Sequence, residues 1–327
     1  MIKVLSLFDG ISGARQALKN LNIDCEYYAS EIDKYAIQVA KKNHPDITHI
    51  GDVKNLICTF DNWLYPKDAN EIFVNFDLLI GGSPCQDLSI AKNNRKGLDG
   101  ERSGLFYEYV RILKECKPKF FILENVASMS KESKELISKE LFNIEPILIN
   151  SSLLTAQQRK RLYWVGKLQQ DGSYKKIEIS QPEDKGILLK DILEDGDTEK
   201  LKSYCITATY SRACPKDYFE HGQRQLVFKK PVKVGHFNKN GQGDRVYSSD
   251  GKSVCLSANG GGRGAKTGLY EIKNMVRKLT PTECARLQGY PDFYHNGISN
   301  SQAYKCYGNS FTVPVIKHIL QHLFLEV

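Results

Sequence analysis

The sequence of 327 residues lacks the features that mark several common classes of protein. Its nine cysteines include no Cys-x-x-Cys pair and no His/Cys cluster with the spacing of a zinc site, and their number is odd. We therefore expect reduced thiols and a cytoplasmic protein. No segment reaches the ~20 apolar residues of a membrane helix, and the apolar run at the N-terminus is too short for a signal peptide. Internal repeats and low-complexity tracts are absent as well.

Charge is a weak signal over the whole chain but a stronger one in part of it. The net charge of +8 is too small to identify a ligand by itself. Residues 200–273, however, hold 14 Lys and Arg against 5 Asp and Glu, a local net charge of +9. The same region has short β-prone runs and glycine-rich turns. We expect the chain after Gly166 to form a second, smaller and irregular domain, to which this region gives a basic surface.

The first half of the sequence alternates short apolar runs with helical patterns. This alternation predicts an α/β fold in which crossover helices join the strands of a parallel sheet. Apolar periodicity also predicts helices near the C-terminus. We expect strands at residues 2–8, 27–30, 76–80, 120–123, 147–149 and 162–165, and helices at 14–21, 34–42, 105–116, 280–288 and 313–325.

A glycine loop and two acidic residues indicate a nucleoside ligand. The loop "FDGISG" follows the first expected strand and opens a helix, so Gly10 and Gly13 can bring backbone N–H groups close to a ligand. Glu31 and Asp52 each follow a strand, where a carboxylate can accept hydrogen bonds from ribose hydroxyls. Phe8 can lie flat against an adenine. Because the Gly-x-Gly-x-x-Gly spacing is missing, S-adenosylmethionine fits better than a dinucleotide.

One cysteine stands apart from the others. Cys85 follows Pro84 just beyond the apolar run 78–80, in "GGSPCQ", so we expect its thiol to be displayed rather than packed. Free cysteines are usually small buried hydrophobes, and we expect this of the other eight: Cys25, Cys58, Cys116, Cys205, Cys214, Cys255, Cys284 and Cys306.

Several motifs, taken in order, carry a resemblance to a known family. They are "FDGISG" at 8–13, "GGSPCQ" at 81–86, "ENV" at 124–126, "QQRKR" at 157–161, "LTPTECARLQGYP" at 279–291 and "YGNS" at 307–310. Their order and spacing resemble the motif series of the C5-cytosine DNA methyltransferases over nearly the whole chain. The resemblance implies a Rossmann-like, S-adenosylmethionine-dependent mixed sheet with a smaller irregular target-recognition domain.

The resemblance also assigns catalytic roles that agree with the chemistry of cytosine. C5 becomes nucleophilic only after a nucleophile adds to C6, and a thiolate is suited to this step. By resemblance, Cys85 on its Pro84 turn adds to C6, and Glu124 acts on ring nitrogen N3. Arg161 holds the cytosine O2, and Arg159 orders the active site. The methyl group of S-adenosylmethionine then moves to C5, leaving S-adenosylhomocysteine.

Ligand-binding residues follow from the same resemblance. A stacked cytosine must rotate out of the duplex, so a basic loop at 86–102 and the +9 region are expected to grip DNA. The expected cofactor-binding residues are Phe8, Gly10, Gly13, Glu31, Ile32, Asp52, Val53, Leu105, Asn309 and Ser310. The expected DNA-binding residues are Gln86, Ser89, Lys92, Arg95, Arg102, Arg212, Arg224, Arg245 and Arg263.

The resemblance further implies a domain division and a biological context. Residues 1–166 would form the first part of the catalytic domain, 167–276 the target-recognition domain, and 277–327 the return to the catalytic domain. The expected partner is double-stranded DNA, with a possible cognate restriction endonuclease, no membrane, and a monomeric state in a bacterial or phage-infected cytoplasm.

Two alternatives remain open at this point. One is a tRNA cytosine methyltransferase, against which the long recognition segment and the missing Cys-Phe-Thr signature argue. The other is an inactive DNA-binding homologue, against which the intact Cys85, Glu124 and Arg161 argue.

Overall fold

The structure is a computed structural model. It describes residues 1–58, 64–66, 75–83, 105–228, 233–236, 245–247, 269–270 and 276–325.

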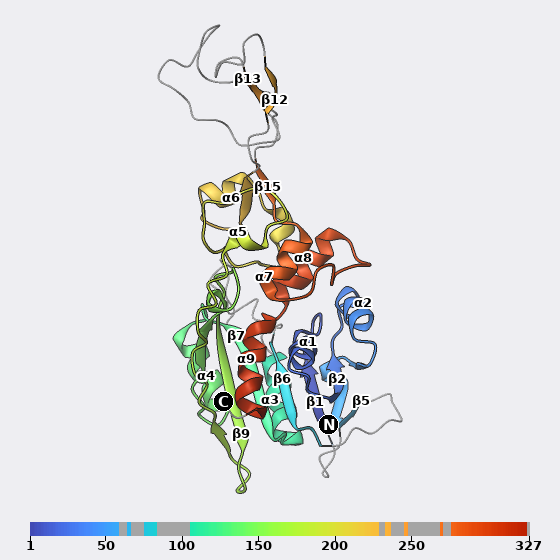
Figure 1. Cartoon of the computed structure of the whole chain (residues 1–327). Helices are drawn as coiled ribbons and strands as arrows, with labels where there is room; N and C mark the ends of the chain where they lie inside the picture. Colours follow the sequence, from blue (N-terminus) through green and yellow to red (C-terminus); the bar gives the residue numbers. More distant parts are fainter. Residues whose placement is uncertain are drawn as a thin grey trace.

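A mixed eight-stranded sheet forms the centre of the molecule (Figure 1). Its order is β10-β9-β7-β6-β1-β2-β3, and β8 also pairs with β9. The strands from β7 to β3 run parallel, whereas β9 runs antiparallel to β7, β8 and β10. The strands are β1 (Ile2–Leu7), β2 (Cys25–Ser30), β3 (Thr48–Gly51), β6 (Leu78–Gly81), β7 (Phe120–Val126), β8 (Ile147–Asn150), β9 (Lys160–Leu168) and β10 (Tyr174–Lys176).

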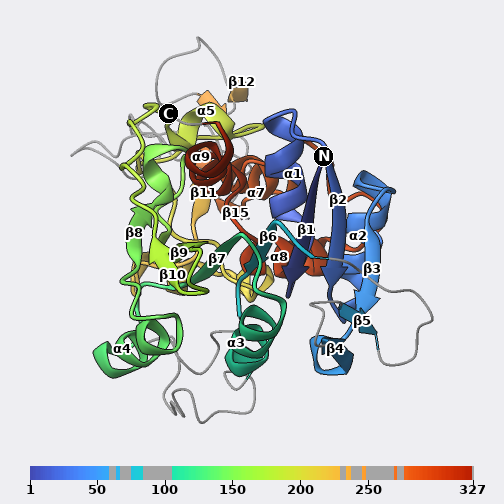
Figure 2. The same cartoon turned by 90° about the horizontal axis from the view of Figure 1, so that it is seen from below.

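Helices cover both faces of this sheet. Figure 2 shows α1 and α9 on one side and α3 and α4 on the other. Alternation along the strands supplies both cores, because successive side chains point to opposite faces. Leu78 and Ile80 belong to the core with α1 and α9, and Leu79 belongs to the core with α3. The helices are α1 (Gly13–Asn20), α2 (Lys34–Asn43), α3 (Leu105–Cys116), α4 (Lys131–Glu140) and α9 (Val313–Phe324).

Shorter elements lie beyond the carboxyl ends of the parallel strands, at the top of Figure 1. Strand β11 pairs with β15, which leads into α7 and α8, while β12, β13 and β14 form a small separate sheet. These elements are α5 (Leu189–Ile192), α6 (Pro215–Phe219), β11 (Leu226–Phe228), β12 (Lys233–His236), β13 (Arg245–Tyr247), β14 (Leu269–Tyr270), β15 (Val276–Lys278), α7 (Pro281–Gln288) and α8 (Asn300–Asn309). Strands β4 (Leu56–Cys58) and β5 (Leu64–Pro66) form a further pair near β3.

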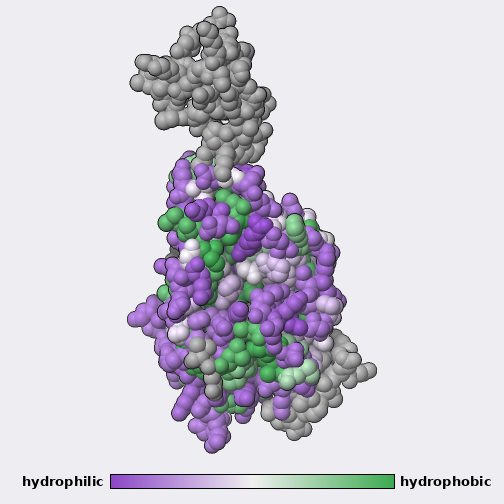
Figure 3. Space-filling model, viewed as in Figure 1, coloured by the Kyte–Doolittle hydropathy of each residue, from purple (hydrophilic) through white to green (hydrophobic). Residues whose placement is uncertain are grey.

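The surface in Figure 3 is largely polar, with apolar residues gathered in patches, as on most folded domains. No helix in the part of the chain that the structure describes is long and apolar enough to span a membrane.

The expected α/β fold with a mixed sheet is confirmed, and the predicted helices and strands are present within a few residues. Strand β7 runs three residues further than predicted, so Glu124 lies inside the strand rather than after it. Helix α4 was missed because Ile137 is its single buried large apolar side chain. Helix α8 was missed because its last turn contains Gly308 and Asn309, which are weak helix formers.

The division at residues 166 and 276 remains a prediction. The central sheet itself continues past residue 166, since β9 ends at Leu168 and β10 ends at Lys176.

Candidate active site at the carboxyl edge of the sheet

Strand register alone brings the predicted site residues together. The last residues of β3, β2, β1 and β6 pair with one another and with a residue inside β7, in the row Gly51, Ser30, Leu7, Gly81 and Leu123. The residues that follow them form one edge, where ligands of open α/β sheets bind. In the same order these residues are Asp52, Glu31, Phe8, Gly82 and Glu124.

The loop after β1 has an unusual backbone. Phe8, Gly10 and Ser12 have φ of 57°, 59° and 61°, in the left-handed region. A Cβ added to Gly10 would meet nothing within 4 Å, so its φ and not crowding favours glycine there. A Cβ on Gly13 would lie 2.5 Å from the Tyr290 hydroxyl, so this glycine allows close packing at the start of α1. The loop therefore leaves its backbone uncovered at Gly10.

Glu31 holds this loop to the end of β2. One carboxylate oxygen accepts a hydrogen bond from the Gly10 N–H at 2.8 Å, and the other accepts from the N–H groups of Ile32 and Asp33, each at 2.8 Å. The Ile32 side chain is 70% exposed. Asp52 caps the short turn Val53–Asn55 by accepting from the Lys54 N–H at 3.0 Å.

These groups fit the adenosine part of S-adenosylmethionine. A carboxylate at Glu31 can accept hydrogen bonds from ribose hydroxyls, an exposed apolar side chain at Ile32 can cover a base, and the open backbone at Gly10 admits a ligand. Val53 is buried and Leu105 is half-buried at the first residue of α3.

Sequence reasoning missed Asp9, which lies within the glycine loop. Its carboxyl is 4% exposed and accepts hydrogen bonds from the Tyr27 hydroxyl at 2.7 Å and from the Ser12 hydroxyl. Burial raises the pKa of Asp9 to about 6, although the hydrogen bonds from the Ser12 and Tyr27 hydroxyls act in the opposite direction. An acidic residue inside a tight, apolar-flanked loop was the signal that could have identified it.

Glu124 and Arg161 form an ion pair at the next part of the edge. The Arg161 Nε lies 2.8 Å from a Glu124 oxygen, and the two side chains are only 15% and 13% exposed. The antiparallel register of β7 and β9 brings them together. Arg161 lies opposite Val126, and Glu124 is two residues before Val126, on the same face of the sheet. A Cβ on Gly82 would lie 3.1 Å from the second Glu124 oxygen, so glycine at 82 leaves room for this carboxylate.

Arg159, two residues away from Arg161, lies inside the protein at 4% exposure. Its Nη1 donates to the Ile206 carbonyl at 3.0 Å, and its Nη2 donates to the carbonyls of Gly308 at 3.2 Å and Ser310 at 3.0 Å. Its guanidinium thus joins the residue just before β9 to the segment after residue 205 and to the end of α8.

Cys205 lies beside the same guanidinium, with its sulfur 3.5 Å from the Arg159 Nη1. Burial alone would raise the pKa of Cys205, but the positive charges of Arg159 and Arg161 outweigh burial and lower it. The expectation of buried cysteines holds for Cys116, Cys284 and Cys306, but it is wrong for Cys214, which is exposed.

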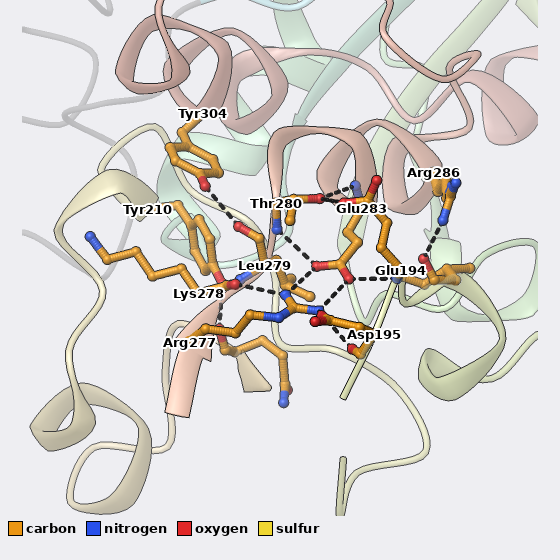
Figure 4. A network of polar contacts seen from close by, with 12 residues as sticks. Glu194, Asp195, Tyr210, Arg277, Lys278, Leu279, Thr280, Glu283, Arg286 and Tyr304 are labelled. Atoms are coloured by element: carbon orange, nitrogen blue, oxygen red, sulfur yellow. Dashed lines mark hydrogen bonds and ion pairs between the residues drawn. The ribbon is translucent and has the colours of Figure 1, made fainter. Parts of the chain in front are cut away.

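The buried carboxylate of Glu283, in α7, binds residues of two other segments, Arg277 and Glu194 (Figure 4). Glu283 is 0% exposed, and its two oxygens accept from Arg277 at 2.8 and 2.9 Å. They also accept from the N–H groups of Thr280 and Glu194, both at 2.8 Å. All these bonds satisfy the buried charge and attach the segment around residue 194 to the start of α7.

The remaining predicted residues fall in different surroundings. The Ser310 hydroxyl donates to the Tyr307 carbonyl at 3.0 Å, and Asn309 is exposed at the end of α8. Arg224 binds Asp217 at 2.9 Å, whereas Arg212 is exposed. Outside the described residues lie Pro84, Cys85, Gln86, Ser89, Lys92, Arg95, Arg102, Arg263 and the side chain of Arg245.

Comparison with known proteins finds similarity over nearly the whole chain. Residues 2–325 match a family model described as C-5 cytosine-specific DNA methylase. The type II methyltransferase M.HhaI of Haemophilus parahaemolyticus is 33% identical, over 98% of this chain and 94% of its own. The orphan methyltransferase M.SPRI of Bacillus phage SPR is 28% identical, over 98% and 97% of the two chains.

Solved structures show the same fold. The methyltransferase EhMeth of Entamoeba histolytica superposes with a TM-score of 0.67 at 17% identity, covering 100% of this chain and 98% of its own. The Dnmt2 methyltransferase of S. pombe gives a TM-score of 0.62 at 19% identity, with 100% of both chains covered. With nearly all of its residues matched by the family model, the chain belongs to the C-5 cytosine-specific DNA methylase family.

Proposed function

We propose that this DNA (cytosine-5)-methyltransferase uses Cys85 as its nucleophile and Glu124 as the group that acts on cytosine N3. The observation that carries the proposal is the Glu124–Arg161 ion pair of 2.8 Å, at the strand edge that also contains Gly82. Cys85 follows Gly82 by three residues in the sequence. The proposal therefore locates the cytosine between the ion pair and this turn.

The chemistry proceeds through addition and elimination on the base. The Cys85 thiolate forms a bond to C6, and the electron pair displaced from the C5–C6 double bond makes C5 nucleophilic. A proton held by Glu124 at N3 favours this addition. After C5 has gained the methyl group it loses its proton, and the C6–S bond breaks to restore the thiolate.

Arg161 and Arg159 have different parts in this proposal. Arg161 orients the Glu124 carboxylate through their ion pair and, in this proposal, binds the cytosine O2. Arg159 is a positioning residue, because its guanidinium binds backbone carbonyls inside the protein.

S-adenosylmethionine, when bound, supplies an electrophilic methyl group. In our proposal Glu31 binds its ribose, Ile32 covers its adenine, and the uncovered backbone at Gly10 admits it. The other residues proposed for this pocket are Phe8, Gly13, Asp52, Val53, Leu105, Asn309 and Ser310.

We further propose that residues 167–276 recognise a short sequence in double-stranded DNA, since their excess positive charge suits phosphate contacts. The restriction-modification or phage-protection role, a cognate endonuclease, the monomeric state and the cytoplasmic location remain predictions.

Covalent trapping tests the proposal. DNA containing 5-fluorocytosine should trap the wild-type protein, because fluorine cannot leave C5 as a proton does. Cys85→Ala should abolish both trapping and methylation while DNA binding persists. The matched control is Cys214→Ala, which removes an exposed thiol and should leave trapping unchanged. Trapping that survives in Cys85→Ala would contradict the assignment.

A further inference from the structure

Arg111, on α3, joins that helix to the turn that follows β3. Its Nη2 donates to the Val53 carbonyl at 3.2 Å, across 58 residues of sequence. The same carbonyl accepts from the Leu56 N–H, which closes the turn Val53–Asn55. The turn begins directly after Asp52, so it contains or adjoins two residues that our proposal places in the cofactor pocket. The guanidinium therefore fixes one part of that pocket to α3.

Two glutamates on the same helix hold the Arg111 guanidinium. Glu108 accepts from Nη2 at 2.8 Å and from Nε at 3.0 Å, and Glu115 accepts from Nη1 at 2.9 Å. Pairs of this kind on a helix surface are usually solvated and contribute little by themselves. The bond to Val53 is different, because it reaches another element, and the planar guanidinium can make it while both pairs remain. Nη2 is shared by Glu108 and Val53, so Glu108 orients the nitrogen that binds the turn.

Apolar packing attaches the same turn to the same helix. Val53 and Leu56 are 3% and 2% exposed, and they belong to the core that contains Phe106 and Val110 of α3. At the start of the turn, Asp52 accepts from a backbone N–H within it at 3.0 Å. The side chain of Val53 is thus held by the core and its carbonyl by Arg111, so the position of its backbone depends on α3.

We propose that Arg111 is a positioning residue for the cofactor, which sets where Asp52 and Val53 meet the adenosine part of S-adenosylmethionine. This inference rests on the cofactor assigned under the proposed function. A ligand binds more tightly to groups that are already held in the bound geometry, because no free energy is lost in ordering them. Without the bond from Arg111 the turn has to be ordered when the ligand binds. The effect concerns adenosine alone, so it is the same for every ligand that contains this group.

Arg111→Gln removes the guanidinium and keeps a polar side chain on α3. Isothermal titration calorimetry should show the affinity for S-adenosylmethionine falling roughly tenfold, the effect of losing one hydrogen bond from a charged group. Affinities for S-adenosylhomocysteine and 5′-methylthioadenosine should fall by the same factor, because both contain adenosine. The methylation rate at saturating S-adenosylmethionine should stay near that of the wild type, so that KM for the cofactor rises while kcat is retained.

Three further variants isolate the bond to Val53. Lys114→Gln, one turn further along α3, removes a partly exposed pair with α4 and should leave all three affinities unchanged. Glu115→Gln should also leave them unchanged, because Glu115 binds Nη1. Glu108→Gln should weaken the binding of all three ligands, by less than Arg111→Gln does, because it loosens the nitrogen that binds Val53.

A purely structural role for Arg111 gives a different pattern. Arg111→Gln would then reduce the rate at saturating cofactor as much as it reduces the affinity, and added S-adenosylmethionine would not restore the rate. That pattern, an unchanged affinity in Arg111→Gln, or unequal losses for the three ligands would each overturn the inference alone. Failure of the wild type to bind any of the three ligands would overturn the proposed cofactor and the inference with it.

Discussion

The two halves of the catalytic edge are assembled in different ways. In the cofactor half, at the ends of β1, β2 and β3, the carboxylate that holds the loop is close to it in sequence: Glu31 binds the N–H of Gly10, 21 residues away. The loop is also covered from a distance, since the Tyr294 hydroxyl donates to the Ile11 carbonyl. In the base half, at the ends of β6 and β7 and the beginning of β9, Arg159 binds the carbonyls of Ile206 and Ser310, 47 and 151 residues away.

This difference has a physical consequence. The bonds from Glu31 to the cofactor loop can form as soon as β1 and β2 pair, whereas the bonds of Arg159 in the base half need both the segment near residue 206 and the end of α8 in place. Substitutions in the cofactor half should therefore change ligand affinity with little effect on the fold. Substitutions at the long-range contacts of the base half should change global stability as well.

The largest expected effect in the base half is on rate. Glu124→Gln keeps a hydrogen-bond acceptor beside Arg161 but removes the proton-transfer group, so methylation should slow by roughly 10²- to 10⁴-fold. Affinity for S-adenosylmethionine, measured by calorimetry, should change little because the cofactor half is intact. The control is Glu115→Gln, which alters an exposed pair with Arg111 on α3. Equal losses of rate and cofactor affinity would contradict the division into two halves.

The next largest effect is on stability. A Cβ on Gly308 would lie 2.2 Å from the carbonyl carbon of Thr207 and 2.3 Å from the N of Ala208, and neither backbone atom can move alone. Gly308→Ala should therefore destabilise the protein by about 3 kcal/mol, outweighing the gain of about 1 kcal/mol that alanine brings to a helix. Denaturant unfolding would measure this. Ser301→Ala, at an exposed site on α8, should be neutral, and a neutral Gly308→Ala would show that this contact is not tight.

The difference in sequence separation between the contacts of the two halves also decides how much of the site the sequence could predict. Strand ends are visible as apolar runs followed by polar residues, so Glu31 and Asp52 could be located at one edge from local patterns alone. The partners of Arg159 could not, because no local pattern links it to carbonyls 47 and 151 residues away. Nothing in the residues next to Arg159 shows that its side chain is buried.

Two other differences between the sequence predictions and the structure, at Asp9 and Glu124, also have identifiable causes. Asp9 was overlooked because acidic residues are common in loops, and only the tertiary position of Tyr27 reveals that its carboxyl is buried. Glu124 was placed after its strand because a charged residue usually ends an apolar run. Strand β7 nevertheless continues to Val126, since Glu124 at the sheet edge pairs with Arg161 instead of entering a core.

The cofactor half provides a smaller and more selective effect. Glu31→Ala removes the acceptor for three backbone N–H groups and, in our proposal, for the ribose, so affinity for S-adenosylmethionine should fall at least about tenfold. The single-turnover rate at saturating cofactor should stay near that of the wild type. Glu26→Ala on the same strand is the control, because its pair with Lys3 is partly exposed. Unchanged affinity in Glu31→Ala would show that the ribose lies elsewhere.

The smallest effect concerns DNA recognition outside both halves. Arg224 is held by Asp217 at 2.9 Å and by the Thr209 hydroxyl at 3.2 Å, whereas Arg212 is exposed. Arg212→Ala should therefore alter DNA binding more than Arg224→Ala does. Loss of a phosphate contact would weaken all sequences alike and reduce the salt slope by about 1, and loss of a base contact would relax one position by about 1–3 kcal/mol. Bisulfite sequencing of a randomised duplex library and salt titrations distinguish the two. A larger loss of DNA binding in Arg224→Ala, with its unfolding temperature unchanged, would show that the Asp217 contact gives way to DNA.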